Sequence, residues 1–266
     1  MPELPEVETI TRALAPHITG RRILSAEFRC LRVLRGGDPE KMAAAIAGKK
    51  ILAVRRAGKF ILIPLQGGQY LTVHLGMTGK LLVGGRPAKH THAIFTLDRG
   101  GVLLYDDQRQ FGRIQVSDSI PARVEKLGPE PLEVSFEEFF RRTRGRKTAI
   151  KALLLNQDFV RGIGNIYADE ALFRARIHPL AVAGRLRRER LRRLHQGIVA
   201  VLSEAISGGG SSISDYVDPE GRKGWFQLQH RVYSRTGLPC SVCGSRIRRV
   251  LVAQRSSHFC PRCQPR

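Results

Sequence analysis

The 266-residue sequence has no apolar run long enough to cross a membrane, and it is short of acidic residues. A membrane-spanning helix needs roughly 20 apolar residues in succession. The opening residues also lack the basic and apolar segments of a secretion signal, so we expect neither membrane insertion nor export. Only 23 acidic residues face 45 basic ones, and the formal net charge is +22. This charge favours polyanionic partners, and nucleic acid is the first candidate.

Cysteine is almost absent until the last 27 residues, which contain four of the five. This distribution excludes a disulfide framework of the secreted type. Cys30 stands alone in a strand-like stretch and is expected to be a small buried hydrophobe. The other four have the spacing C-x2-C-x16-C-x2-C, which predicts one structural zinc ion held by two knuckles. The predicted ligands are Cys240, Cys243, Cys260 and Cys263.

The apolar periodicity changes once along the chain. Residues 22–117 alternate apolar and polar positions in short runs broken by glycine, which is typical of an antiparallel sandwich or barrel. A short helix is expected before them, over residues 7–16. Residues 119–135 lose this periodicity and contain three prolines, as a domain crossing does. From residue 136 onward, apolar positions three and four apart predict helices.

We therefore predict an α+β protein with an N-terminal antiparallel β-sandwich over residues 1–130 and helices flanking it. A helical DNA-binding domain is expected over 131–225 and a zinc finger over 226–266. The stretch 206–225 is rich in glycine, serine and aspartate and is expected to form a loop.

The segment "GIGNIYADEALF" at residues 162–173 predicts a turn followed by a helix that Asn165 caps. A glycine-flanked helix N-terminus presents unpaired backbone amides that suit a phosphate. Two glycines before a helix also arise from simple turn chemistry. The nearby basic residues Arg146, Lys147 and Lys151 favour phosphate binding.

The N-terminus, "MPELPEVE", allows two interpretations. If Met1 is removed, Pro2 carries a free secondary amine, and an α-amino group titrates about 2.5 pH units below a lysine. Such an amine is a nucleophile that can condense with an aldehyde carbon, and Glu3 and Glu6 would supply acid or base beside it. The alternative is a helix start, in which proline precedes an acidic first turn.

Taken in order and spacing, a set of short motifs along the whole chain resembles bacterial formamidopyrimidine-DNA glycosylase. The motifs are "PELPEVE" at 2–8, "GKF" at 58–60, "HLGMTG" at 74–79, "KHTH" at 89–92, "QRQFG" at 108–112, "LGPEPL" at 127–132, "GIGNIYADEALF" at 162–173, "FQ" at 226–227 and the four-cysteine finger. The resemblance implies a helix-two-turn-helix element, a lesion-capping loop and a zinc-finger β-hairpin. It also implies a bifunctional enzyme that removes 8-oxoguanine and formamidopyrimidines from duplex DNA and then cuts the strand.

The resemblance also assigns roles. Pro2 would attack the sugar C1′ and hold the DNA as a Schiff base, with Glu3 as proton donor and Glu6 in support. Lys59 would donate a proton in β-elimination, and Arg255 would assist δ-elimination. The residues expected to grip the DNA backbone are His74, His90, Arg146, Lys151 and Asn165. A base must leave the stack before its glycosidic bond can be reached, and the residues expected to fill the resulting gap are Met77, Arg109 and Phe111.

Two regions depart from the family pattern. Gln108 stands where the family has proline, and Gln110 stands where it has a cation. Ser211 and Ser212 replace two threonines in the lesion-capping region. Lesion preference is therefore less strongly indicated than the chemistry.

Two other functions remain in competition. Endonuclease VIII has the same architecture and prefers oxidised pyrimidines, but Leu4 and Val7 favour the purine enzyme. A non-enzymatic zinc-finger DNA-binding protein would explain the charge and the cysteines but leave Pro2 and Lys59 without a role. The expected location is the bacterial cytoplasm, in association with the nucleoid. Nothing in the sequence requires more than a monomer.

Overall fold

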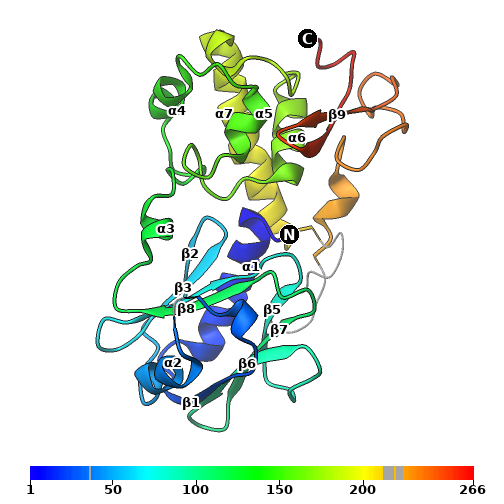
Figure 1. The fold of residues 1–266 in the computed structure, drawn as a ribbon. Coiled ribbons are helices and arrows are strands. Elements are labelled where there is room, and N and C mark those ends of the chain that lie inside the picture. The colour runs from blue at the N-terminus through cyan, green and yellow to red at the C-terminus, as the bar shows by residue number, and fades with distance from the viewer. Residues whose placement is uncertain (36, 212–218, 220–223) are drawn as a thin grey trace. The chain divides into compact units, whose positions relative to one another are not determined.

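The computed structural model describes residues 1–35, 37–211, 219 and 224–266. The chain divides into two compact units (Figure 1). Residues 1–126 and 209–225 form the first unit, and residues 127–208 and 226–266 form the second. In the described part of the chain, no helix is both long enough and apolar enough to cross a membrane.

The first unit contains two four-stranded antiparallel sheets (Figure 1). One has the order β1-β6-β7-β5, and the other has the order β2-β3-β4-β8. The strands of the first sheet are β1 (Ile23–Phe28), β6 (Thr91–Leu97), β7 (Val102–Asp107) and β5 (Gly79–Val83). The strands of the second sheet are β2 (Arg55–Ala57), β3 (Phe60–Pro64), β4 (Tyr70–His74) and β8 (Arg113–Ser117). The predicted antiparallel β-sandwich is confirmed.

One apolar core lies between these elements. Ile61 and Val73 of one sheet are fully buried, as are Phe95 and Leu103 of the other, and all four belong to the same cluster. The helix α1 (Leu4–Ile18) adds apolar residues spaced three and four apart, such as Leu14. Its apolar face therefore packs into the sandwich core, which fixes the N-terminus of the chain.

Several local expectations differ from the structure. The helix α1 begins at Leu4 and not at residue 7, because Glu3 caps it and Pro5 suits the first turn. The sequence analysis missed β5 and the helix α2 (Pro39–Ile46), which Asp38 caps with its side chain. Within the alternating region, β2 is short: of residues 50–56 only Arg55 and Arg56 belong to it, and Lys50 and Ile51 form isolated bridges. The other helical segments here are η1 (Leu31–Val33) and α3 (Ala122–Glu125).

The second unit is helical, with one hairpin. Its helical segments are α4 (Phe136–Thr143), α5 (Ile150–Leu155), α6 (Asn165–Arg174), η2 (Ala183–Arg185), α7 (Arg188–Ser207) and η3 (Phe226–Gln229). The strands β9 (Arg248–Val252) and β10 (Arg255–Phe259) pair antiparallel and are joined by a two-residue turn. The expected zinc-finger hairpin is confirmed. Most of the expected loop over 206–225, including Ser212, lies outside the described residues.

Candidate active site and nucleic-acid interface

The N-terminal carboxylates form a capping box at the start of α1. The side chain of Glu3 accepts the backbone N–H of Glu6, and Glu6 Oε2 accepts the backbone N–H of Glu3 at 2.8 Å. Pro2, Glu3 and Glu6 are all buried. The helix-start interpretation of this segment is therefore correct as local structure. It does not exclude catalysis, because the same contacts hold both carboxylates beside the chain terminus.

The other carboxylate oxygen of Glu6 reaches a second segment of the same unit. Glu6 Oε1 accepts the backbone N–H of Ser211 at 2.8 Å. A Cβ added to Gly210, whose φ is +81°, would lie 3.0 Å from this oxygen. A Cβ on Gly224 would lie 2.4 Å from the carbonyl oxygens of Gly209 and Gly210. The two ends of this segment are therefore tied together beside Glu6, and only glycine permits the approach.

The chain terminus lies among charged groups. Met1 is present, so the nitrogen of Pro2 is an amide and the free amine belongs to Met1. Burial lowers the pKa of this amino group below its usual range. Glu3 and Glu6 raise that pKa, whereas the charge of Lys59 lowers it. Removal of Met1 would leave the imino group of Pro2 as the chain terminus, directly before the buried carboxylates of Glu3 and Glu6.

Lys59 and His74 lie on the second sheet. Lys59 occupies the turn between β2 and β3, after Gly58 with a φ of +59°, and is only 8% exposed. His74 ends β4, stacks on Phe60 with ring centres 4.9 Å apart, and accepts the backbone N–H of Gly76. Burial lowers the pKa of His74 to about 4, with a further contribution from the charge of Lys59. His74 is thus neutral at physiological pH and offers a ligand hydrogen bonds but no positive charge.

A basic cleft of about 490 Å³ adjoins His74 in the first unit. Arg35, Arg113 and Arg123 contribute its positive charge, and Phe111 lies at its wall. Phosphate groups are the anions that such arginine forks bind best.

Asp107 organises the loop that carries two of the expected gap-filling residues. Its carboxylate is fully buried and accepts the backbone N–H groups of Gly112 at 2.8 Å and Arg109 at 3.3 Å. It also accepts the hydroxyl of Thr78 at 2.5 Å and that of Tyr105 at 3.2 Å. Burial raises the pKa of Tyr105 well above its usual range, so the tyrosine remains a donor.

This arrangement brings Met77, Arg109 and Phe111 into one exposed group. A Cβ on Gly76 would lie 2.4 Å from the backbone nitrogen of Gly112, so the Met77 turn and the Phe111 loop are in contact. Met77 is 39% exposed and Phe111 is 50% exposed. The guanidinium of Arg109 lies 4.8 Å from the centre of the Phe111 ring. Apolar groups that remain exposed beside a stacked arginine are what a gap-filling wedge requires.

The departures Gln108 and Gln110 lie in this same loop. Gln108 is exposed, and Gln110 adopts a φ of +55°, in the left-handed region. His90 is half-buried next to the loop, and its carbonyl oxygen accepts the N–H of Asp107 at 2.9 Å.

In the second unit, Asn165 does not cap α6. Gly164 is the N-cap residue, so Asn165 is already the first helical residue. Its side-chain oxygen is buried, and no described residue donates to it. The side-chain oxygen of Asn165 is thus an acceptor that a ligand at the start of α6 can use.

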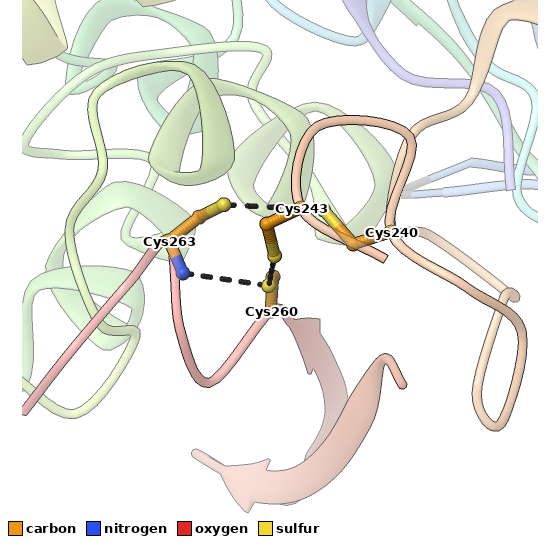
Figure 2. Close-up of side chains that lie close together, drawn as sticks. All are labelled: Cys240, Cys243, Cys260 and Cys263. Carbon is orange, nitrogen blue, oxygen red and sulfur yellow. Dashed lines mark hydrogen bonds between the residues drawn. The ribbon is translucent and has the colours of Figure 1, made fainter. Parts of the chain in front are cut away.

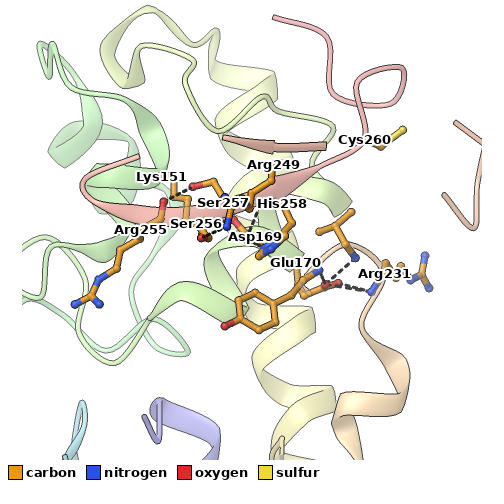
Figure 3. A network of polar contacts seen from close by, with 12 residues as sticks. Lys151, Asp169, Glu170, Arg231, Arg249, Arg255, Ser256, Ser257, His258 and Cys260 are labelled. Carbon is orange, nitrogen blue, oxygen red and sulfur yellow. Dashed lines mark hydrogen bonds and ion pairs between the residues drawn. The ribbon is translucent and has the colours of Figure 1, made fainter. Parts of the chain in front are cut away.

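Lys151 is buried and not at the surface. Its ammonium is fully buried, lies 2.7 Å from the Asp169 carboxylate, and donates to the Ser256 carbonyl at 2.9 Å. The other Asp169 oxygen accepts the backbone N–H of His258 at 2.9 Å (Figure 3). Lys151 and Asp169 together therefore hold β10, whose first residue, Arg255, is exposed.

Glu170, the next residue of α6, holds the segment before the zinc finger. Its carboxylate accepts the backbone N–H groups of Arg231, Val232 and Tyr233 at 2.9–3.1 Å (Figure 3). Burial nevertheless raises the pKa of Glu170 above its usual range. Arg146 lies in the exposed loop before α5, where it lines an open cavity with Lys147 and Arg185.

The four C-terminal cysteines converge as predicted (Figure 2). Their sulfur atoms all lie within 4.8 Å of one another, with Cys240–Cys263 at 3.9 Å and Cys243–Cys260 at 3.4 Å. A tetrahedral zinc with bonds of about 2.3 Å requires sulfur atoms about 3.8 Å apart, so the donor set fits one closed structural site.

Three family models match the chain. The N-terminal domain of formamidopyrimidine-DNA glycosylase matches residues 1–114, the H2TH domain of that enzyme matches 127–217, and a zinc finger found in FPG and IleRS matches 237–266. The formamidopyrimidine-DNA glycosylase of Solibacter usitatus is 64% identical over the full length of both chains. The chain belongs to the formamidopyrimidine-DNA glycosylase family.

Solved structures of the family agree with this. The MutM (Fpg) protein of Thermus thermophilus is 44% identical, with a TM-score of 0.90 over 99% of this chain and 98% of that one. A Lactococcus lactis Fpg mutant in complex with Fapy-dG-containing DNA is 36% identical, with a TM-score of 0.93 over both full chains. The Lactococcus lactis enzyme in complex with DNA containing an abasic site has a TM-score of 0.92.

Sequence reasoning about this family member missed its supporting carboxylates. Asp169 and Glu170 lie within the quoted motif GIGNIYADEALF, and Asp107 directly precedes the motif QRQFG, but none of the three was recognised as a positioning group. Each is almost fully buried. A carboxylate in an otherwise apolar run is the signal that would have identified Asp169 and Glu170, because buried charges require partners.

Proposed function

We propose that this protein is a bifunctional DNA glycosylase and abasic-site lyase that excises 8-oxoguanine and formamidopyrimidines from duplex DNA. Excision proceeds through a Schiff base on Pro2 and is followed by β,δ-elimination, as one step of base excision repair. The observation that carries this proposal is the geometry of the chain terminus, where a capping box holds the buried carboxylates of Glu3 and Glu6 directly after Pro2. The Lactococcus lactis relatives solved with lesion-containing DNA support the same substrate class.

The proposed chemistry begins once Met1 is removed. The Pro2 nitrogen attacks the sugar C1′, the bond to the base breaks, and Glu3 supplies a proton as the sugar ring opens. Glu6 holds Glu3 through the capping box. Lys59 serves β-elimination, and Arg255 at the start of β10 assists δ-elimination.

For DNA binding, we propose that Met77, Arg109 and Phe111 fill the gap left by the everted nucleotide. His74, His90, Arg146 and Asn165 bind the backbone. For Lys151 we propose an indirect role, because its ammonium is already occupied by Asp169 and the Ser256 carbonyl. It would hold the hairpin that carries Arg255.

We further propose that the protein works as a monomer in the bacterial cytoplasm, associated with the nucleoid. Its functional parts would be a catalytic domain over residues 1–130, a DNA-binding domain with its lesion-capping loop over 131–225, and the finger over 226–266. Both polypeptide units would contribute to a single DNA complex.

A borohydride trapping assay tests the proposal. The protein is mixed with duplexes that contain 8-oxoguanine, formamidopyrimidine or thymine glycol, reduced, and analysed by peptide mass spectrometry. We expect an adduct on Pro2 with the two purine lesions and none in the Pro2→Gly variant or in protein that retains Met1. A sugar remnant on a lysine, or no adduct at all, would refute the mechanism. Preferential trapping on thymine glycol would instead indicate an enzyme of the endonuclease VIII type.

A further inference from the structure

A cluster of two phenylalanines and three arginines joins α4 to the N-terminal half of α7. The rings of Phe136 and Phe140 lie 5.9 Å apart. Arg188 lies 5.0 Å from the centre of Phe136 and 4.7 Å from that of Phe140. Arg192 lies 4.8 Å over Phe136, and Arg144 lies 5.6 Å over Phe140. We call these five residues the arginine–phenylalanine cluster.

The cluster lies at the opposite end of α7 from the start of α6. Tyr167, in the first turn of α6, contacts Phe226, which in turn approaches Gly208 at the end of α7. Arg174, the last residue of α6, approaches Gly197 near the middle of α7. The two helices are therefore antiparallel, and the first turns of α7 extend beyond α6. At 1.5 Å per residue, the two ends of α7 are about 30 Å apart.

The arginines of the cluster remain available to a ligand. Arg144 and Arg192 are exposed, and no carboxylate among the described residues pairs with either. Arg188 pairs with Glu137 but is still 47% exposed. A guanidinium that rests its face on an aromatic ring keeps its N–H edges free. Because the aromatic ring already restricts the arginine side chain before a ligand binds, less side-chain entropy is lost on binding.

The residues around the arginine–phenylalanine cluster suit a polyanionic ligand that has no apolar groups. Residues 185–193 contain six arginines and one glutamate. Protein partners usually insert aromatic or aliphatic anchors into a complementary apolar patch. None of the large exposed hydrophobic residues of the described chain lies on α4 or α7. The phosphate backbone of DNA needs only guanidinium groups, which bind it through paired hydrogen bonds.

We propose that the arginine–phenylalanine cluster is a second DNA-binding surface, which holds the backbone of an undamaged duplex while the lesion site is occupied. The surface is separate from the phosphate site at the start of α6 because the two lie at opposite ends of α7. It requires none of the catalytic residues.

The test uses protein that has been trapped covalently on a short lesion-containing duplex and purified. A labelled undamaged duplex is then titrated into this complex at several salt concentrations, and binding is followed by fluorescence anisotropy. The wild-type complex should bind the second duplex. The R144Q/R188Q/R192Q variant should bind it more weakly, with a salt slope smaller by about 2 to 3, since each phosphate contact contributes about 0.9. Excision on the short duplex should be unchanged.

A matched variant controls for net charge. R29Q/R32Q/R86Q removes three exposed arginines of the first unit and should bind the second duplex as the wild type does. If the triple cluster variant is unstable, R192Q alone should lower the salt slope by about 1. If trapping fails, the same comparison is made with free protein and undamaged duplex.

Three results would overturn the proposal. The first is a wild-type complex that binds no second duplex, and the second is a cluster variant that cannot be distinguished from the charge control. The third is a complex that binds polyglutamate but not DNA, which would identify the cluster as a surface for acidic proteins.

Discussion

The hydroxyl of Thr78 lies 2.5 Å from the carboxylate of Asp107 and also accepts the backbone N–H of Arg109 at 3.0 Å. Thr78 follows Met77 directly, so this contact joins the Met77 turn to the loop of Arg109 and Phe111. Asp107 has no proposed role in the chemistry, but through Thr78 and the backbone of its own loop it holds the three proposed gap-filling side chains in one place.

Replacing Asp107 with Asn should therefore weaken lesion excision without affecting the active-site amine. The amide cannot accept all of the hydrogen bonds that the carboxylate accepts, and hydrogen bonds to a charged group contribute about 1.5–3 kcal/mol each. We expect excision from duplex DNA to fall at least tenfold, with a smaller loss for Thr78→Val. The measurement is single-turnover excision of 8-oxoguanine. Equal rates for wild type and Asp107→Asn would show that the loop does not need this anchor.

The pair Lys151 and Asp169 should behave as a buried ion pair. Removing one partner leaves an uncompensated charge in the interior and costs about 3–5 kcal/mol, whereas replacing both with apolar residues costs less. Asp169→Asn and Lys151→Met should each be less stable than the double variant Lys151→Met/Asp169→Asn, in which neither charge remains. Urea unfolding measures the three differences. A double variant whose loss equals the sum of the single losses would contradict the coupling.

The same variants test how β10 is held. Because Asp169 also accepts the His258 backbone N–H, its loss should loosen the hairpin that presents Arg255. Asp169→Asn should therefore lower the ratio of δ- to β-elimination products more than it lowers trapping on Pro2. Asp158→Asn, on the same unit, is the control, since the backbone N–H of Asp158 bonds to Asn156 and its side chain lies outside the Asp169 network. If Asp169→Asn leaves the ratio of δ- to β-elimination products unchanged, Asp169 is not needed to position Arg255.

Features that depend on short segments of the sequence could be predicted, whereas features that depend on distant contacts could not. The antiparallel strands, the four cysteines and the nucleophile candidate follow from local patterns, because period-two burial and knuckle spacing are properties of short segments. The contacts of Asp107, Asp169 and Glu170 include partners 5, 89 and 62 positions away, and such contacts leave no local periodicity. Asn165 was assigned as a cap because asparagine is common there, but Gly164 occupies that position.

Loss of zinc should release the finger while the first unit remains folded. Cys240 and Cys260 are buried together with Phe173, Val232 and Ile247, so the metal and a small apolar cluster support each other. Cys260→Ser should abolish stoichiometric zinc and weaken DNA binding at least tenfold. Metal analysis and a DNA titration measure both effects. DNA affinity that survives a strong chelator would show that the finger does not contact the duplex.

Stability should fall as the pH drops from about 6.5 to about 4. Burial lowers the folded-state pKa of both His74 and His230 to about 4, whereas an unfolded histidine titrates near 6.5. Between these pH values the two histidines are protonated in the unfolded chain but remain neutral in the folded protein. The stabilisation present above pH 6.5 is therefore lost on acidification. Each histidine contributes at most on the order of 3 kcal/mol. Urea unfolding of His74→Gln should show a weaker pH dependence than the wild type, and an identical dependence would contradict this origin.

The turn between β9 and β10 should be open to stabilisation. Ala253 and Gln254 both have positive φ, at 48° and 58°, and Val252 pairs directly with Arg255. This is a two-residue turn whose backbone normally selects Asn-Gly, since L-residues with a Cβ are strained there by about 1–2 kcal/mol. Replacing Gln254 with Gly removes that strain but adds backbone entropy to the unfolded chain. We expect a net gain of about 0.5–1 kcal/mol in unfolding free energy, whereas Gln227→Gly, in η3, should give no gain. If Gln254→Gly destabilises the protein instead, a contact of the Gln254 side chain outweighs the backbone strain.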